Sequence, residues 1–390
     1  MLNVDNAAEY LIERGLMSVD SILSGDLIIS SAARRNRNLR IKRKDDPSYL
    51  IKQPDDPAGG AQQTLRSEAA FYSFCFADAE AEPVREFLPA LRYFDPERSL
   101  VVFDFLEGAV PLWQYSGSRE ETSRLVGHAL ATFHRTFRGT QNPKLGWLHR
   151  QTPWVMRVHK PSPELLASLS PANVETLRIL QTQEKISAHL DALRRKWRVE
   201  TVIHNDIKSD NILVKGSGPG AQGSGAGALP GVSAERSPEP RALSPEPLSV
   251  ALVDWELVQL GDPAWDVAGL LQDFILLWVT SMTVTPGATV DVLAASARLP
   301  LTDLQRAIRA FWKGYRAAAG QTPAEEAQLI TRAVAYSAAR LIQSAYEMGA
   351  VTPALAPASV LLLQVSANLL RDPEAGQVQL YGLIQGYVPV

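Results

Sequence analysis

Short apolar runs divided by turn residues occupy most of the first hundred residues, and this pattern is typical of strands. Ahead of them, residues 1–15 have the spacing of a short helix. We expect five strands after Asp26, with one main helix at about 62–76 between the third strand and the fourth. The strands are predicted at 26–30, 38–43, 49–53, 90–94 and 99–105. The front of the chain is therefore predicted to be mostly sheet.

After Pro111 the apolar residues recur at helical spacing instead. Helices are predicted at 120–137, 174–197, 267–282, 302–319, 323–348 and 358–370. Two short apolar runs, 211–214 and 250–255, interrupt this region and are predicted to be strands. The pattern indicates an α+β protein with a sheet-rich front and a helical rear.

The two rear strands are separated by residues 216–249, in which 19 of 34 residues are Gly, Pro or Ser and none is aromatic. Such a segment buries too little apolar surface to offset the entropy of ordering it, so we expect a disordered insert. Its residues Gly218, Gly220 and Gly223 spell GxGxxG, the wording of a phosphate-binding turn. No helix start follows them, and we therefore interpret these glycines as low complexity.

Composition and charge restrict the possible functions. The formal net charge is −3 over 390 residues, which predicts no general affinity for nucleic acid or anionic membranes. The single cysteine, Cys75, rules out an internal disulfide and fits a reducing cytoplasm. The N-terminus does not resemble a signal peptide, and no apolar run reaches the length of a membrane span. We therefore expect a cytoplasmic protein without nucleic-acid or membrane partners.

A strongly polar stretch precedes the first rear strand. It reads HNDIKSDN at 204–211 and sets His204, Asp206 and Asn211 in the spacing HxDxxxxN. Phosphoryl transfer needs a carboxylate to accept a proton from the acceptor hydroxyl, and oxygen ligands for Mg²⁺. Asp254 follows the apolar part of the second rear strand, so a hairpin would bring it close to Asn211. The pattern predicts that the amide and this carboxylate share one metal ion.

Three motifs in this order resemble those of the aminoglycoside phosphotransferase-like family of the protein kinase-like fold, which includes choline and homoserine kinases. They are HNDIKSDN at 204–211, VDWE at 253–256 and GDPAWD at 261–266. The resemblance implies a two-lobed fold with a small antiparallel-sheet N-lobe and a mainly helical C-lobe. It also implies that Asp206 is the catalytic base, that Asn211 and Asp254 bind Mg²⁺, and that ATP is the phosphate donor.

Other site residues follow from the same resemblance. Lys208, two residues after Asp206, instead resembles the lysine with which Ser/Thr protein kinases steady the transferring phosphoryl group, and this likeness favours a peptide or protein acceptor. His204 and Asp266 are expected to support the catalytic loop. Residues of the hinge and of the first rear strand are assigned to the nucleotide site, namely Asp104, Phe105, Glu107 and Leu213.

A lysine and a glutamate of the front lobe complete the expected site. The family needs a strand lysine to hold the nucleotide phosphates, and Lys52 is the candidate, with Lys42 as the alternative. Glu68 lies on the apolar stripe of the helix at 62–76, where a carboxylate needs a cationic partner. We expect that partner to be Lys52. The loop at 30–38 contains no glycine, so contacts of its backbone with phosphate are in question. The alternatives are phosphate contacts from Ser30, Ser31 or the arginines, or a purely structural turn.

The resemblance also implies a division of the chain. A nucleotide-binding lobe is expected at 1–103, a hinge at 104–110, and a helical lobe at 111–390 that carries the insert. We expect an ATP- and Mg²⁺-dependent phosphotransferase that acts on a hydroxyl group of a small molecule. A Ser/Thr kinase acting on a peptide or protein, for example in ribosomal peptide modification, is the alternative. A nucleotide-binding pseudokinase is the third possibility.

The charges of the rear helices bear on the acceptor. From Val267 to the end, eight acidic residues are matched by eight basic ones. A polycationic aminoglycoside needs a lining of carboxylates, so this balance argues against such a substrate. Asp273 and Glu347 are the candidate acceptor contacts.

Overall fold

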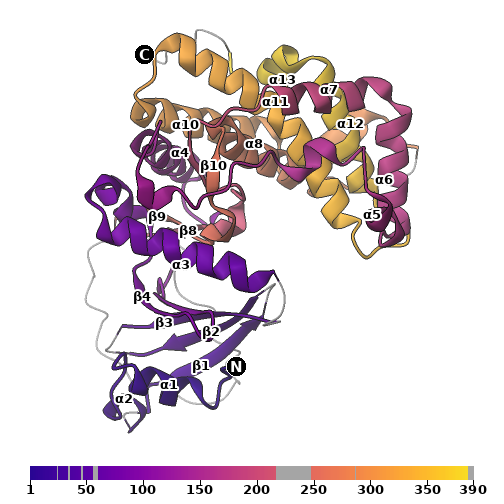
Figure 1. The fold of residues 1–390 in the computed structure, drawn as a ribbon. Coiled ribbons are helices and arrows are strands. Elements are labelled where there is room, and N and C mark those ends of the chain that lie inside the picture. The colour runs from indigo at the N-terminus through magenta and orange to yellow at the C-terminus, as the bar shows by residue number, and fades with distance from the viewer. Residues whose placement is uncertain are drawn as a thin grey trace, which may run out of the picture.

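The computed structural model describes residues 1–23, 25–33, 36–44, 47–55, 60–216, 247–285 and 287–384. Figure 1 shows two parts, one built on a sheet and holding the N-terminus, the other larger, helical and holding the C-terminus. The expected two-lobed α+β architecture is therefore confirmed. Residues 217–246, which make up most of the expected insert and include its GxGxxG glycines, lie outside the described residues.

A five-stranded antiparallel sheet forms the first part, with the strands in the order β1, β2, β3, β5, β4. The strands are β1 (Ile28–Ala33), β2 (Asn36–Lys42), β3 (Tyr49–Pro54), β4 (Leu91–Asp95) and β5 (Leu100–Asp104). Because side chains alternate between the two faces of a strand, Ile51 packs with helix α1 (Ala7–Glu13), and Lys52 points to α3 (Ala61–Ala77). This alternation places a lysine on the sheet face that meets the second part.

Helix α3 joins the two parts. Its Tyr72 ring lies 4.6 Å from the ring of Phe103 in the sheet. The neighbouring Phe71 ring lies 4.7 Å from the ring of Trp255 in the helical part. Both aromatic side chains are buried, so α3 shares one continuous core with the sheet and with the helices behind it (Figure 1).

The second part is mainly helical. Its helices are α4 (Arg119–Thr136), α5 (Pro163–Ala167), α6 (Pro171–Thr182), α7 (Glu184–Arg195), α8 (Pro263–Thr280), α9 (Val290–Ala295), α10 (Leu301–Ala319), α11 (Pro323–Met348), α12 (Pro357–Arg371) and α13 (Pro373–Gln379). Helix α2 (Asp20–Leu23) belongs to the first part. No helix among the described residues has the length and apolar character that a membrane span requires. The apolar run at 267–282, interpreted as a buried helix, lies almost wholly in α8.

The single helix predicted at 174–197 is wrong. Two helices, α6 and α7, meet at Gln183, whose ψ of 79° is not helical. The buried face of α6 includes Leu177 and Leu180. At helical spacing the next buried residue would fall near 184, but the next apolar residue of the sequence that is buried is Ile186. The phase of the stripe therefore changes at the junction. With no Gly or Pro there, local propensity gave no sign of the break.

Two small sheets carry the polar loops. One contains β6 (Val110–Pro111), β8 (Ile212–Lys215) and β9 (Ser249–Leu252), and the other pairs β7 (Thr201–Ile203) with β10 (Gln259–Gly261). The expected hairpin is present, because Ile212 pairs with Leu252 and Val214 with Val250. The predicted strand 250–255 was too long. It ends at Leu252, because Asp254 takes a left-handed conformation with φ 71° that no strand accommodates.

Candidate active site

Lys52 stands between two carboxylates from different parts of the chain. Its Nζ lies 2.7 Å and 3.0 Å from the two carboxylate oxygens of Glu68 in α3. The same nitrogen lies 2.6 Å from Oδ1 of Asp254, which follows β9. Lys52 and Glu68 are almost fully buried, whereas one third of the Asp254 side chain is exposed. The expected pairing of Lys52 with Glu68 is present, and the pair reaches across to the rear hairpin.

The three charges shift one another's pKa values. Burial alone would lower the pKa of Lys52, but the two carboxylates outweigh it, so its pKa is raised and the ammonium stays charged. Burial raises the pKa of Glu68 to about 7, against the opposing charge of Lys52. Burial also raises the pKa of Asp254, yet Lys52 more than offsets this, so the pKa of Asp254 is lowered. Asp254 therefore carries its negative charge at neutral pH.

The loop predicted to be catalytic, residues 204–211, runs from β7 to β8 and contains Asp206; it is called the catalytic loop below. Oδ2 of Asp206 accepts hydrogen bonds from Nζ of Lys208 at 2.6 Å and from Nδ2 of Asn211 at 3.1 Å. Nδ2 of Asn211 also donates to the backbone carbonyl of Asp206 at 2.9 Å. Asn205 just before Asp206 has φ 71°, which turns the chain sharply. The loop thus gathers one carboxylate, one ammonium and one amide within hydrogen-bonding distance.

Buried side chains hold the backbone of this loop. Asp266 in α8 accepts hydrogen bonds from the backbone N–H groups of His204 at 2.7 Å and Asn205 at 2.8 Å. Arg340 in α11 donates to the carbonyl oxygens of Ile207 at 2.8 Å and of Asn205 at 3.3 Å. Gly269 is needed beside it, because a Cβ there would lie 2.6 Å from the carbonyl oxygen of Ile207. The position of the loop is therefore set by α8 and α11.

The same network brings Asn211 and Asp254 together. The backbone N–H of Val253 donates to the carbonyl of Asn211 at 2.9 Å, at the end of the β8 and β9 ladder. Nε2 of His204 lies 2.9 Å from the carbonyl oxygen of Val253, and its ring packs on Trp255. His204 therefore ties the catalytic loop to the segment that carries Asp254.

The residues present suit a divalent cation such as Mg²⁺. The amide nitrogen of Asn211 faces Asp206, which leaves its amide oxygen as a possible ligand. The ionised Asp254 directly follows Val253, whose backbone N–H bonds the carbonyl of Asn211. Amide and carboxylate oxygens are ligands that Mg²⁺ prefers, usually with waters and substrate phosphates completing the shell. Within the described ranges no cluster of three or more His, Cys, Asp or Glu could hold a metal alone. The set fits an ion bound together with a nucleotide.

The segment expected to be the hinge follows β5. The carboxylate of Asp104 pairs with Arg92 at 2.6 Å and 2.7 Å, and the backbone N–H of Phe105 donates to the carbonyl of Ser48 at 2.8 Å. Glu107 contacts the hydroxyl of Ser48. The side chains of Asp104 and Glu107 are therefore engaged within their own part, and a role for them at the nucleotide stays a prediction. A nucleotide contact by Asp104 or Glu107 would have to come from the backbone groups of these residues.

Lys42, the alternative strand lysine, lies in β2, and Leu213, an expected nucleotide contact, lies in β8. Lys42 is exposed, and its Nζ lies 5.6 Å from the centre of the Phe105 ring, so Lys52 is the strand lysine that meets Glu68. Leu213 lies in β8 opposite Pro111 and Ala251. The segment 30–38, expected to be a loop, lies mostly in β1 and β2, and residues 34 and 35 between them are outside the described part of the chain. Its role at the nucleotide phosphates stays a prediction.

Sequence reasoning missed several supporting residues. His134 in α4, which the sequence did not assign to the site, is buried, with Nε2 3.2 Å from Asp266 and Nδ1 2.8 Å from the hydroxyl of Tyr315. Asp273 was a candidate acceptor contact, and this is wrong, because it is buried and bonded to Ser209 and Trp113. The only signal in the sequence for the structural role of Asp273 was its position as the one carboxylate inside the apolar run 267–282.

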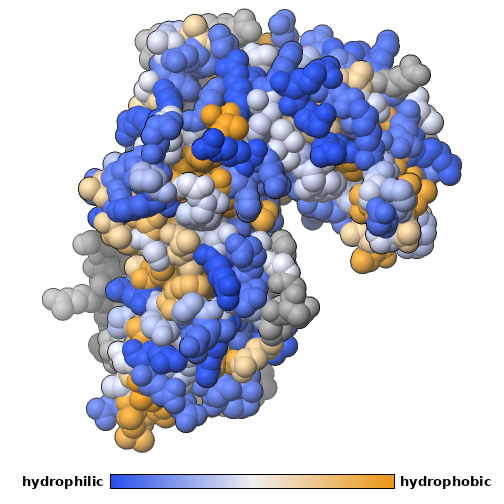
Figure 2. Space-filling view, viewed as in Figure 1, coloured by the Kyte–Doolittle hydropathy of each residue, from blue (hydrophilic) through white to orange (hydrophobic). Residues whose placement is uncertain are grey.

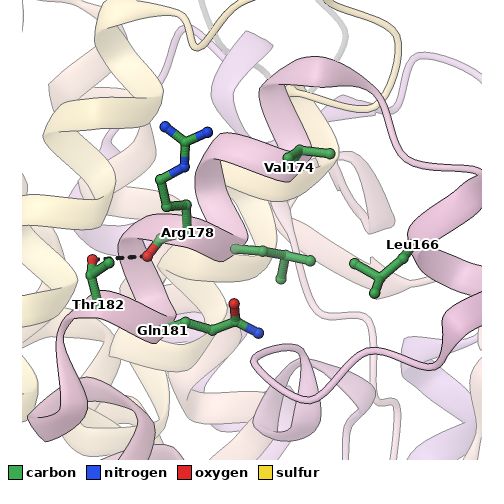
Figure 3. Close-up of a pocket in the computed structure, with 6 residues that line it drawn as sticks. Leu166, Val174, Arg178, Gln181 and Thr182 are labelled. Atoms are coloured by element: carbon green, nitrogen blue, oxygen red, sulfur yellow. Dashed lines mark hydrogen bonds between the residues drawn. The ribbon is translucent and has the colours of Figure 1, made fainter.

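A surface cavity of about 350 Å³ lies elsewhere, against α5 and α6 (Figure 3). Its lining residues are Leu166, Val174, Leu177, Arg178, Gln181 and Thr182. None of them belongs to the catalytic loop or to the hairpin. We therefore do not assign this cavity to the chemistry at Asp206.

Several solved structures share the fold of this chain. An amicoumacin kinase in complex with AMP-PNP, Ca²⁺ and its ligand Ami matches with a TM-score of 0.51 at 10% identity, over 94% of each chain. A choline kinase from Cryptosporidium parvum Iowa II matches with a TM-score of 0.54 at 9% identity, over 98% of each chain. A mutant aminoglycoside 2′-phosphotransferase IIIa with GDP matches with a TM-score of 0.50 at 11% identity, over 97% of this chain and 99% of the other. At such identities the likeness shows the fold.

The family comes from the sequence. No curated protein matches the chain at a significant level. The family model described as the phosphotransferase enzyme family matches residues 29–223, which is half of the 390 residues. The matched range includes Lys52, Glu68 and the whole catalytic loop. The chain belongs to the phosphotransferase enzyme family.

Proposed function

We propose that the chain transfers the γ-phosphoryl group of ATP to a hydroxyl group of a small molecule. The observation that carries this proposal is that a lysine of the sheet and a carboxylate of the helical part meet beside the loop of Asp206. Nζ of Lys52 in the sheet bonds Asp254, which follows strand β9. Asp254 lies next to the loop that holds Asp206 and Asn211. Positioning and charge neutralisation are what phosphoryl transfer requires of a protein.

Each residue has a distinct role in this proposal. Lys52 holds the nucleotide phosphates from the side of the sheet, while Asn211 and Asp254 would hold Mg²⁺. When bound, Mg²⁺ would neutralise negative charge that develops on the nucleotide phosphates. Asp206 accepts the proton of the acceptor hydroxyl, and Lys208, whose ammonium already touches Asp206, offsets negative charge on the transferring group.

Lys208 is suited to that role because it stays protonated. Burial would lower its pKa, but the charge of Asp206 and the hydrogen bond to it outweigh burial, so the pKa of Lys208 is raised. In this proposal residues 1–103 form the nucleotide-binding lobe, 104–110 the hinge and 111–390 the acceptor-binding lobe. The buried, single Cys75 is in keeping with a cytoplasmic location.

A small-molecule acceptor is favoured over a peptide. The names of the structurally similar proteins refer to amicoumacin, choline and an aminoglycoside, all of which are small molecules. Figure 2 shows a hollow between the sheet-rich part and the overhanging helices near α5. Glu347 in α11 is exposed and contributes to the raised pKa of Lys208. We therefore retain Glu347 as a candidate acceptor contact.

The acceptor class can be tested directly. We expect that the purified protein, incubated with ATP, Mg²⁺ and a host extract divided by ultrafiltration, phosphorylates a component of the small-molecule fraction. Mass spectrometry would identify the species that gains phosphate, and the Asp206→Asn protein is the matched control. Phosphate appearing only on peptides or proteins would contradict the small-molecule assignment and favour the kinase alternative.

The proposed metal ligands make a second prediction. Asn211→Ala and Asp254→Asn should each raise the Mg²⁺ concentration needed for half-maximal ADP release by about tenfold or more, because each removes one ligand oxygen or its charge. The measurement is ADP release titrated with Mg²⁺ at saturating ATP. Asp210→Asn is the control, since Asp210 is exposed and directly precedes Asn211. Unchanged titrations for both variants would exclude these two side chains as ligands.

A further inference from the structure

A second buried carboxylate of α8 holds the far end of the catalytic loop. Oδ2 of Asp273 accepts hydrogen bonds from the backbone N–H of Ser209 at 2.8 Å and from the indole N–H of Trp113 at 2.9 Å. Asp273 is only 6% exposed. Such a group has to be fully paired where it lies, because burying an unpaired carboxylate is costly.

The two partners of Asp273 come from segments on either side of the proposed site. Ser209 lies between Lys208 and the proposed metal ligand Asn211, at the start of a short 3₁₀ turn, Ser209–Asn211. Trp113 lies just after β6, which continues the segment proposed as the hinge and pairs with β8. The Trp113 ring also packs against Phe274, with the ring centres 4.9 Å apart. One carboxylate oxygen therefore connects the end of the hinge segment to the turn that orients Lys208 and Asn211.

Asp273 differs from Asp266 in what it holds. Asp266 fixes the first residues of the loop, at His204 and Asn205, and Arg340 fixes carbonyl groups in its middle. The other backbone bonds of this turn run from the N–H of Asn211 to the carbonyl of Lys208, within the loop, and from the N–H of Val253 to the carbonyl of Asn211. The hydrogen bond to Ser209 is thus the contact from α8 that acts on the turn itself.

Resting on the proposed function, we propose that Asp273 is a positioning residue for phosphoryl transfer. It touches neither nucleotide nor acceptor. Because Asp273 bonds both the N–H of Ser209 and the indole of Trp113, it fixes the position of Ser209. Ser209 in turn sets the orientation of Lys208 before it and Asn211 after it. Displacement of a reacting group by about 1 Å can cost about 100-fold in rate, so loss of this anchor acts on kcat while leaving nucleotide affinity largely intact.

The test compares Asp273→Ala and Asp273→Asn with a matched control, Asp262→Ala. Asp262 is a fully buried aspartate at the start of the same helix, bonded to Arg332 and Tyr336 and not to the catalytic loop. Its loss reports the general cost of removing a buried carboxylate from α8. The readouts are ADP release with Mg²⁺ and ATP, binding of AMP-PNP by calorimetry, and hydrogen exchange of the amides at 204–211.

We expect Asp273→Ala to lower kcat by about 10- to 100-fold, to leave AMP-PNP affinity nearly unchanged, and to speed exchange of the Ser209 amide. Asp273→Asn should retain most activity, because one amide oxygen can accept both hydrogen bonds. Asp262→Ala should lower the melting temperature while keeping kcat and loop exchange. Equal kcat per folded molecule in Asp273→Ala and Asp262→Ala, or unchanged exchange at Ser209, would overturn the proposal.

Two further outcomes separate this inference from the proposed function. If wild-type protein and Asp206→Asn release ADP at the same rate, the proposed function fails, and the exchange of Ser209 still decides whether Asp273 anchors the loop. If Asp273→Ala does not fold, Trp113→Phe replaces it, because phenylalanine keeps the packing on Phe274 and removes one donor. A lower kcat at unchanged AMP-PNP affinity would support the proposal, and a wild-type kcat would overturn it.

Discussion

Replacing Asp206 by Asn is expected to lower the rate of ADP release by about 10²- to 10⁴-fold, the usual contribution of a general base. The carboxamide has nearly the same shape as the carboxylate but cannot accept the proton of the acceptor hydroxyl. Its oxygen can still accept hydrogen bonds from Lys208 and Asn211, so the loop should keep its conformation. The rate is measured at saturating ATP and Mg²⁺, with the acceptor once it is known and with water until then.

The matched measurement for this variant is AMP-PNP binding, which should stay close to wild type because Asp206 is not assigned to nucleotide binding. Retained binding with lost turnover identifies a chemical role. Residual ADP release equal to that of the wild-type protein would contradict the assignment of Asp206 as the base, and would also remove the main support for an enzyme acting at this loop.

Replacing Lys52 by Met should have two large effects. Nucleotide affinity should fall, because the ammonium expected to hold the phosphates is gone. The free energy of unfolding should fall by about 3–5 kcal/mol, the usual cost of leaving one partner of a buried ion pair alone. The partner here is Glu68, which is 1% exposed and whose pKa burial already raises to about 7. Calorimetry measures the first effect and denaturant unfolding the second.

The double variant Lys52→Met with Glu68→Leu separates these effects. Removing both charges should restore much of the lost stability, since an apolar pair of similar volume avoids the cost of burying charge. It should not restore nucleotide binding. Recovery of AMP-PNP affinity in the double variant would show that Lys52 acts on the fold alone, and a single variant as stable as the wild type would contradict the buried ion pair.

Much of the site could be predicted because its chemistry follows from local patterns. The pairing of Lys52 with Glu68 follows from one carboxylate on the apolar stripe of α3, since such a group needs a cation. The closeness of Asn211 and Asp254 follows from two apolar strands flanking a long polar segment, which form the β8 and β9 hairpin. In the first case a buried carboxylate needs a cationic partner, and in the second two buried strands need to pair, so few arrangements of these residues are possible.

Other features depend on tertiary contacts that leave little trace in the sequence. Asp254 follows four apolar residues and was predicted to lie in a strand, yet its left-handed backbone turns it toward Lys52. Asp273 could be recognised as unusual in a buried helix, but its partners Ser209 and Trp113 are 64 and 160 residues away.

The most direct test of the account is a crystal structure of the protein with AMP-PNP and Mg²⁺. We expect a metal ion bound by the amide oxygen of Asn211 and a carboxylate oxygen of Asp254, at distances of about 2.0–2.1 Å. Nζ of Lys52 should contact the nucleotide phosphates, and the terminal phosphate should face Asp206. A nucleotide bound elsewhere, or a metal ion that touches neither Asn211 nor Asp254, would contradict the account.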